Sequence, residues 1–291
     1  MASAVLAGGV LLSGVASADE DPAKDNRWIP SLSIYTAGLP EDRKASADSE
    51  VSGFQDGESV GFPWSVGGEA AIASPVLGSS KLKPRIFIHG GAGYVRDSKD
   101  PVSSVDDPGD PPFVPPFQPD PESVENQGSV VKAEAKPFVL TGGVGTILEV
   151  AAFDRTFYLR PSLEWMYRRD TIQGILGAAE GENLDINGNC APCRILHITA
   201  QTEKGYHSLG AGLEAGIDGG RMGDFEVRFF ASGRVYHILG DRKTAISPVG
   251  EWMTTDGSPT SRPDTVDNIR YEREPVHYRV GIGLRFLWQP E

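Results

Sequence analysis

The sequence HYRVGIGLRFLW, residues 277 to 288, alternates between two kinds of side chain. One set is apolar and consists of Tyr278, Val280, Ile282, Leu284, Phe286 and Trp288. The other set is polar or small and consists of His277, Arg279, Gly281, Gly283 and Arg285, with Leu287 as the exception. Successive side chains of a β-strand point to opposite faces, so the segment predicts a strand with one apolar face and one face of glycine and arginine.

The same alternation recurs upstream and predicts about eight strands in all. They lie near residues 27–37, 60–76, 84–96, 137–152, 155–169, 195–217, 223–239 and 275–288. Short links at 77–83, 153–155 and 218–222 alternate with long links at 38–59, 97–136, 170–194 and 240–274. Asp218-Gly219-Gly220 is a hairpin-turn signal in the last short link. The pattern is typical of an all-β, up-and-down antiparallel transmembrane β-barrel of eight strands, with short periplasmic turns and long extracellular loops.

We expect the long links to be solvated loops. Asp106 to Pro121 reads DDPGDPPFVPPFQPDP within the loop at about 97–136, and proline removes the backbone donor that helices and sheets need. Thr171 to Glu182 is a candidate short helix in the third long link.

The apolar faces of the predicted strands end in aromatic residues. Amphipathic rings favour the boundary between membrane and water, so we expect two aromatic girdles. The periplasmic girdle would hold Trp28, Phe157, Phe225, Phe286 and Trp288, and the outer girdle Tyr94, Phe138, Trp165, Tyr167 and Tyr278.

The opposite faces carry acidic and basic residues separated by glycine. A barrel of about eight strands has a lumen that side chains can fill, and charges removed from water must pair. We therefore predict an internal charge network of Glu69, Arg85, Glu149, Arg160, Glu164, Arg168, Glu214, Glu226, Arg228, Arg234, Arg279 and Arg285. Three hairpin neighbours are predicted within it: Glu69 with Arg85, Glu149 with Arg160, and Glu214 with Arg228.

Composition excludes two classes of protein. No stretch approaches the roughly 20 apolar residues of a transmembrane helix. A net charge of -13 argues against a nucleic-acid partner, because phosphate binding needs a basic surface. The apolar run from Ala4 ends in Ala16-Ser17-Ala18, which predicts a signal peptide over 1–18 cut after Ala18 and a barrel domain over 19–291.

Few residues point to chemistry. Cys190 and Cys193 predict a small loop-closing disulfide in an exported protein, with a redox pair or a zinc site as weaker alternatives. His207 and Ser208 are adjacent, but a strand places them on opposite faces. His89 has no evident nucleophile beside it, so we predict no cofactor, no metal and no catalytic residue.

The chain resembles the small outer-membrane β-barrel family of Gram-negative bacteria typified by outer-membrane proteins A and X. The resemblance rests on RWIPSLSIYTAG, FYLRPSLEWMYRR and the terminal HYRVGIGLRFLW, although Gln289-Pro290-Glu291 follow the last aromatic residue. It implies an integral protein of the bacterial outer membrane, in contact with lipid and lipopolysaccharide and inserted by the barrel-assembly machinery.

This resemblance specifies an architecture and leaves several functions open. We favour a non-enzymatic role in envelope structure or in contact with an extracellular partner through the loops. The alternatives are a porin-like narrow or gated pore, a lipid-modifying enzyme and a soluble lipocalin-like binding barrel with its apolar face turned inward.

Overall fold

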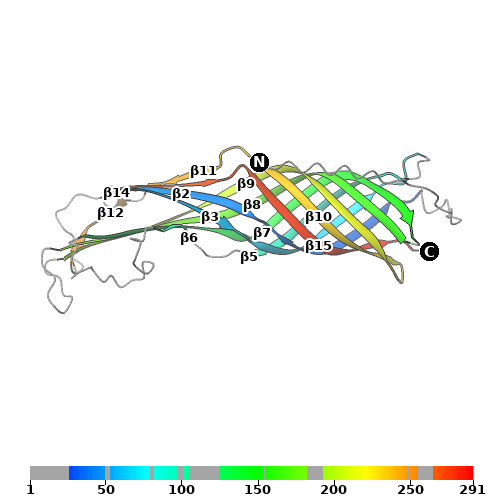
Figure 1. Ribbon diagram of the computed structural model, residues 1–291, viewed down its shortest axis with the longest axis horizontal. Coiled ribbons are helices and arrows are strands. Elements are labelled where there is room, and N and C mark those ends of the chain that lie inside the picture. The colour runs from blue at the N-terminus through cyan, green and yellow to red at the C-terminus, as the bar shows by residue number, and fades with distance from the viewer. Residues whose placement is uncertain are drawn as a thin grey trace.

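The computed structural model describes residues 26–49, 53–78, 82–96, 101–104, 125–153, 155–181, 193–247, 249–254 and 265–290. Regular structure in these ranges consists of β-strands (Figure 1). No helix in this part of the chain is long and apolar enough to cross a membrane.

Eight strands form a closed antiparallel ring. They are β1 (Ile29–Gly38), β4 (Trp64–Ala73), β5 (Arg85–Arg96), β7 (Glu125–Ala152), β8 (Arg155–Gly181), β9 (Cys193–Met222), β10 (Phe225–Leu239) and β15 (Val276–Trp288). Each pairs with the strands before and after it in this order, and the β1–β15 pairing closes the ring into a barrel. The predicted all-β fold and its eight antiparallel strands are therefore confirmed.

Side chains on every strand of the ring divide into an outer apolar set and an inner polar set. Ser33, Glu69, Arg160 and Arg285 are among the buried polar residues, although most apolar residues of the same strands are exposed. The exposed set includes two large apolar side chains from each strand: Leu32, Ile34, Val66, Ile72, Ile86, Ile88, Leu140, Val144, Leu159, Leu163, Leu209, Leu213, Phe229, Val235, Val280 and Ile282. The barrel is thus apolar outside and charged inside.

The turn between β9 and β10 differs from the prediction. Strand β9 continues to Met222, and the chain reverses at Gly223, whose φ of 59° favours glycine. The expected turn residues form an irregularity in the ladder instead, where Asp218 Oδ1 accepts a hydrogen bond from the Gly220 backbone at 2.7 Å. Arg228 then lies opposite Asp218, and the register shifts beside it.

Proline residues mark where several strands leave the barrel. Leu39-Pro40 separates β1 from β2 (Glu41–Ser49), Phe62-Pro63 separates β3 (Gly53–Gly61) from β4, and Pro275 follows β14 (Thr265–Arg273). Proline has no backbone N–H and interrupts the ladder. The backbone bond from Leu39 N to Pro63 O, at 2.8 Å, keeps the two strands together across the first two interruptions.

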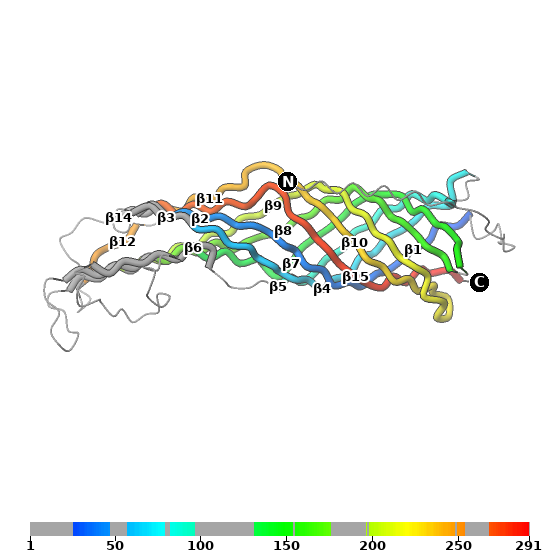
Figure 2. The backbone as a smooth tube through the Cα atoms, in the orientation of Figure 1, coloured from blue at the N-terminus to red at the C-terminus, as the bar shows by residue number. Residues whose placement is uncertain are grey.

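Beyond these prolines, β2, β3, β11 (Lys243–Ile246) and β14 form a second antiparallel sheet, with β12 (Val249–Gly250) paired to β14. Strands β7, β8 and β9 run past the barrel into the same region, joined by β6 (Pro101–Ser104) and β13 (Met253–Thr254). Figures 1 and 2 show this extension projecting from one end of the barrel. A shared apolar core joins its two layers: Ala45, Val131, Ala133, Ile172, Ile269 and Tyr271.

The extension corrects the prediction that the long links are solvated loops. The described parts of all four long links contain strands. Polar and apolar residues continue to alternate in these links, outside the barrel. The candidate helix at 171–182 is also wrong: these residues belong to β8 as far as Gly181 and pair with β9. The signal peptide, the Pro-rich stretch 106–121 and Cys190 lie outside the described residues, so the disulfide stays a prediction.

Candidate functional site

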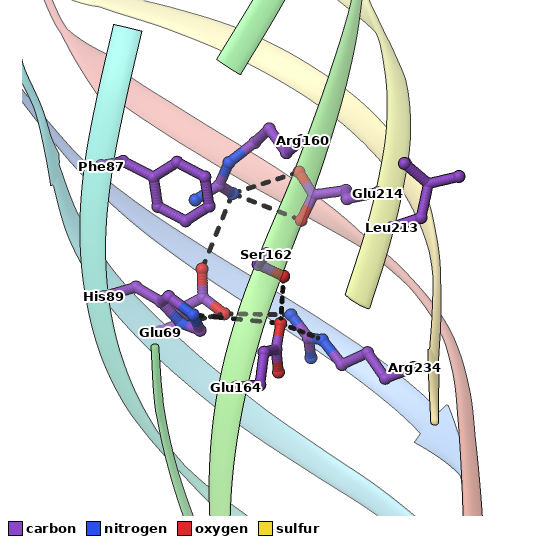
Figure 3. A pocket seen from close by; sticks show the side chains of 9 residues that line it. All are labelled: Glu69, Phe87, His89, Arg160, Ser162, Glu164, Leu213, Glu214 and Arg234. Atoms are coloured by element: carbon purple, nitrogen blue, oxygen red, sulfur yellow. Dashed lines mark hydrogen bonds and ion pairs between the residues drawn. The ribbon is translucent and has the colours of Figure 1, made fainter. Parts of the chain in front are cut away.

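The centre of the barrel holds a cluster of buried charges from six strands. Its acidic members are Glu69 on β4, Glu164 on β8 and Glu214 on β9. Its basic members are Arg160 on β8, Arg234 on β10 and Arg285 on β15. His89 on β5 lies near Arg160, Arg234 and the three carboxylates (Figure 3). Strand alternation turns each of these side chains inward, so six strands contribute to one site.

Glu69 connects the most partners in this central cluster. Its carboxylate lies 3.1 Å from Arg285 Nη2, 3.2 Å from Arg234 Nη2 and 3.7 Å from Arg160 Nη1. His89 Nδ1 lies 3.2 Å from its Oε2 atom. The side chain is 3% exposed, so these contacts replace the water that a carboxylate would otherwise bind.

The other two carboxylates complete the cluster. Glu214 contacts Arg160 Nη1 at 3.2 Å and Arg285 Nη2 at 3.0 Å. Glu164 lies 2.9 Å from Arg234 Nε, and it accepts hydrogen bonds from the hydroxyls of Tyr236 and Ser162, each at 2.8 Å. Each carboxylate is therefore held by donors from more than one strand.

Small residues make room for these groups. A Cβ atom at Gly143 would collide with the Leu163 carbonyl oxygen and with His89 Nε2. At Gly145 it would lie 2.8 Å from the Phe87 ring. That ring in turn packs under the Arg160 guanidinium, 3.9 Å from its centroid. Glycine on β7 thus permits large side chains on β5 to fill the lumen.

A second cluster fills the end of the barrel that carries the short turns. Arg228 lies 2.7 Å from Glu149 and 2.5 Å from Glu226, with its guanidinium 4.9 Å from the Tyr158 ring centroid. Gln289 Nε2 donates to Glu226 at 3.1 Å. The residue after Trp288 therefore belongs to the internal network.

The predicted hairpin pairs are wrong as ion pairs, although their members lie in the lumen. Glu69 lies opposite Gly91 in mid-strand, whereas Arg85 lies near the turn and donates to the backbone oxygen of Ser74 at 2.9 Å. Glu149 pairs with Arg228 on β10, leaving Arg160 to Glu214 and Glu69. Long arginine side chains reach across the lumen, so position along one hairpin does not determine their partners.

A third cluster, which we call the mouth cluster, lies where the extension meets the barrel. It consists of Glu41 and Arg43 on β2, Arg168 and Asp170 on β8, and Arg273 on β14. Arg168 contacts Glu41 at 2.6 Å and Asp170 at 3.1 Å, and Arg273 contacts both carboxylates, Asp170 at 3.1 Å. Arg43 Nη1 also donates to the Ala133 backbone oxygen at 2.7 Å, which joins the second sheet to β7.

Only Arg168 of the mouth cluster was expected inside the barrel. The signal that could have identified the others is the alternation of Glu41, Arg43 and Ala45 after Pro40. The many charged residues of this link instead suggested a solvated loop. Burial of the Glu41 carboxylate opposes its ionisation. Three surrounding guanidinium groups outweigh burial and hold the pKa of Glu41 well below its ordinary range.

The aromatic residues expected in girdles lie on the outer surface at both ends of the strands. Phe225 lies opposite Trp288 at the short-turn end, where Phe157 is also exposed and Phe286 is half-buried beside them. At the other end, Tyr94 packs edge-on against Phe138, with ring centroids 6.2 Å apart. Trp28, just before β1, and Tyr278, near the start of β15, are exposed. Trp165 stacks on Tyr167, and both rings are half-buried.

The clusters have a structural explanation that leaves little free chemistry. The Ser162 hydroxyl donates a hydrogen bond to Glu164, and the His89 ring lies between two carboxylates that already bind arginine. His207 is exposed and Ser208 is buried, as alternation requires. Among the described residues, no three His, Cys, Asp or Glu side chains are grouped to hold a metal ion.

Comparison with known proteins gives only distant similarity. No protein-family model and no curated protein match the chain. Among solved structures, the outer membrane protease OmpT from Escherichia coli matches at 7% identity with a TM-score of 0.24, over 89% of this chain and 97% of that chain. A TodX monoaromatic hydrocarbon channel mutant matches at 8% identity with a TM-score of 0.12, over 92% of each chain. Similarity this low establishes neither fold nor activity.

Substitution of Glu69 with Ala should destabilise the barrel strongly. It leaves buried guanidinium groups without their shared carboxylate, a loss of about 3–5 kcal/mol in the free energy of unfolding. Urea unfolding of the protein in detergent micelles measures it. Glu203→Ala is the matched control, because Glu203 also pairs with two cations but is 44% exposed. Equal urea midpoints for the two variants would contradict the role of Glu69 as the shared carboxylate of the central cluster.

The mouth cluster predicts that acid loosens the extension. The pKa of Glu41 is lowered on folding, so its stabilisation is complete above its ordinary pKa of about 4.3 and is lost as pH falls below that value. Hydrogen exchange in β2 and β14, corrected for intrinsic rates, should therefore accelerate below about pH 4.

Glu41→Gln should remove this acid dependence and expose the same strands at neutral pH. Glu58→Gln on β3 is the control, because the Glu58 side chain is 72% exposed and pairs with a surface lysine. Acid-accelerated exchange that persists unchanged in Glu41→Gln would contradict the role of this carboxylate.

Proposed function

We propose that the chain is an integral protein of the bacterial outer membrane. Its barrel spans the lipid, and its β-extension stands outside the membrane as a non-enzymatic surface for envelope structure or for contact with a partner. Short turns face the periplasm and longer connections face outward in such barrels, which supports placing the extension on the cell surface.

The observation that carries this proposal is the apolar surface on all eight strands around a charged interior. Each strand exposes at least two large apolar side chains, and aromatic rings border them at both ends. Soluble proteins rarely expose contiguous apolar patches larger than a few hundred Å². A lipid environment accounts for this surface, because hydrocarbon does not penalise apolar side chains and the closed ring leaves no unpaired strand edge.

The same arrangement counts against the alternatives. A lipocalin-like barrel would turn its apolar face inward, the reverse of what the strands do. An open pore needs a water-filled path. The lumen is instead occupied at successive levels by the central cluster, by the cluster around Arg228 at the short-turn end and by the mouth cluster. An enzyme needs a reactive group within reach of substrate, and His89 in the central cluster is buried between paired carboxylates.

A charge placed on the apolar face tests the proposal. Ile282→Arg should block assembly of the barrel, because an arginine near the middle of the lipid costs about 2–4 kcal/mol. Val249→Arg is the control: Val249 is 60% exposed and Ile282 is 62% exposed, but Val249 lies on the extension.

The readouts are outer-membrane fractionation and heat-modifiable migration on a gel. The parent chain and Val249→Arg should fractionate with the outer membrane and migrate faster when unheated, and Ile282→Arg should do neither. Extraction of the parent chain without detergent, or normal assembly of Ile282→Arg, would contradict a lipid-facing barrel.

A further inference from the structure

Arg279 differs from the other buried arginines of the barrel. It lies on β15, faces the lumen and is 2% exposed. None of its three side-chain nitrogens has a hydrogen-bond partner among the described residues. Its closest described interaction is with the Tyr35 ring, whose centroid lies 4.5 Å from the guanidinium carbon.

The strand register increases the cost of this charge. Arg279 lies directly opposite Arg234 on β10, and like charges in that position repel. The carboxylates nearest to Arg234 are Glu69 and Glu164, which already bind the central cluster. A guanidinium removed from water without a counter-charge is strongly unfavourable, so Arg279 requires a partner other than the residues that the structure describes.

Neighbouring side chains also present unused polar atoms. The hydroxyl of Tyr35 and both ring nitrogens of His277 are buried and have no hydrogen-bond partner in the part of the chain that the structure describes. His277 stacks on Tyr236, with ring centroids 5.3 Å apart, and lies two residues from Arg279 on the same face of β15. Three groups in one part of the lumen therefore have donors that the described residues do not use.

The three charge clusters and the two arginines beside them hold more arginines than carboxylates. Among the described residues, the three clusters together with Arg85 and Arg279 contain nine arginines and seven carboxylates. The arginines are Arg43, Arg85, Arg160, Arg168, Arg228, Arg234, Arg273, Arg279 and Arg285. The carboxylates are Glu41, Glu69, Glu149, Glu164, Asp170, Glu214 and Glu226.

We propose that the lumen binds a small monovalent inorganic anion of the chloride class against Arg279. The guanidinium supplies the counter-charge, and the buried hydroxyl of Tyr35, the residue whose ring the guanidinium covers, would supply a neutral donor. A monovalent ion fits a buried site, because dehydration of a multiply charged anion such as phosphate costs far more. The site neutralises part of the charge excess and does not depend on whether the barrel lies in a membrane.

Bromide tests the site directly, because it replaces chloride and scatters anomalously. Crystals of the full chain in detergent, grown with sodium bromide, should show an anomalous peak beside the Arg279 guanidinium. Ordered water alone at that position, with no bromide peak, would overturn the proposal.

Thermal unfolding in solution gives an independent test that needs no crystal. At constant ionic strength, replacing gluconate with chloride should raise the Tm of the parent chain as the logarithm of chloride concentration. The dependence should vanish in Arg279→Met and remain in Arg270→Met, whose arginine is exposed on β14.

If the arginine is simply uncompensated, a different result follows. Arg279→Met would then raise the Tm equally in both salts, and the parent chain would show no chloride dependence, which overturns the proposal. The parent measurement alone decides the outcome if Arg279→Met does not fold.

Discussion

Charges removed from water must find opposite charges, and this constraint organises the whole barrel. Eight strands turn arginine and glutamate into a lumen that is too narrow for bulk water. Glu69 meets the constraint by bridging β5, β8, β10 and β15, so strands that are not neighbours in the ring are tied through its centre. The cross-lumen contacts supply the cohesion that an apolar core supplies in a soluble protein. They also leave the apolar side chains free to face outward.

The extension follows from the same principle at the barrel mouth. Prolines end the ladder of several barrel strands without ending the strands' alternation, so β2 and β14 continue as a separate sheet. Glu41 and Asp170 then join this sheet to β8 through three arginines, beside an apolar core that includes Ile172 and Tyr271. The mouth cluster places buried charges at the end of the barrel and joins the extension to β7 and β8 at the same time. The extension is thus joined to the barrel by buried ion pairs and a shared apolar core.

Much of this architecture follows from the sequence, and the rest required tertiary structure. Period-two alternation is a local property, so the strands and the inward direction of residues such as Arg160 and Arg285 could be predicted. Ion-pair partners depend on which side chains meet across the lumen. For that reason the predicted pairing of Glu69 with Arg85 is wrong. The extension was missed because proline and charge in the long links indicated loops, although Glu41, Arg43 and Ala45 alternate. The isolation of Arg279 could not be inferred from composition, because it depends on what its neighbours already bind.

The orientation of side chains on β15 tests the central claim most directly. Nitroxide labels are placed one at a time from Tyr278 to Leu287 in a chain whose two cysteines are replaced by serine, and the protein is reconstituted in lipid vesicles. Accessibility to oxygen, which concentrates in lipid, should alternate with a period of two, high at Val280 and Ile282 and low at Gly281 and Arg285. Absence of alternation, or high oxygen accessibility at the arginine and glycine positions, would contradict a barrel with its apolar face in lipid and its charges in the lumen.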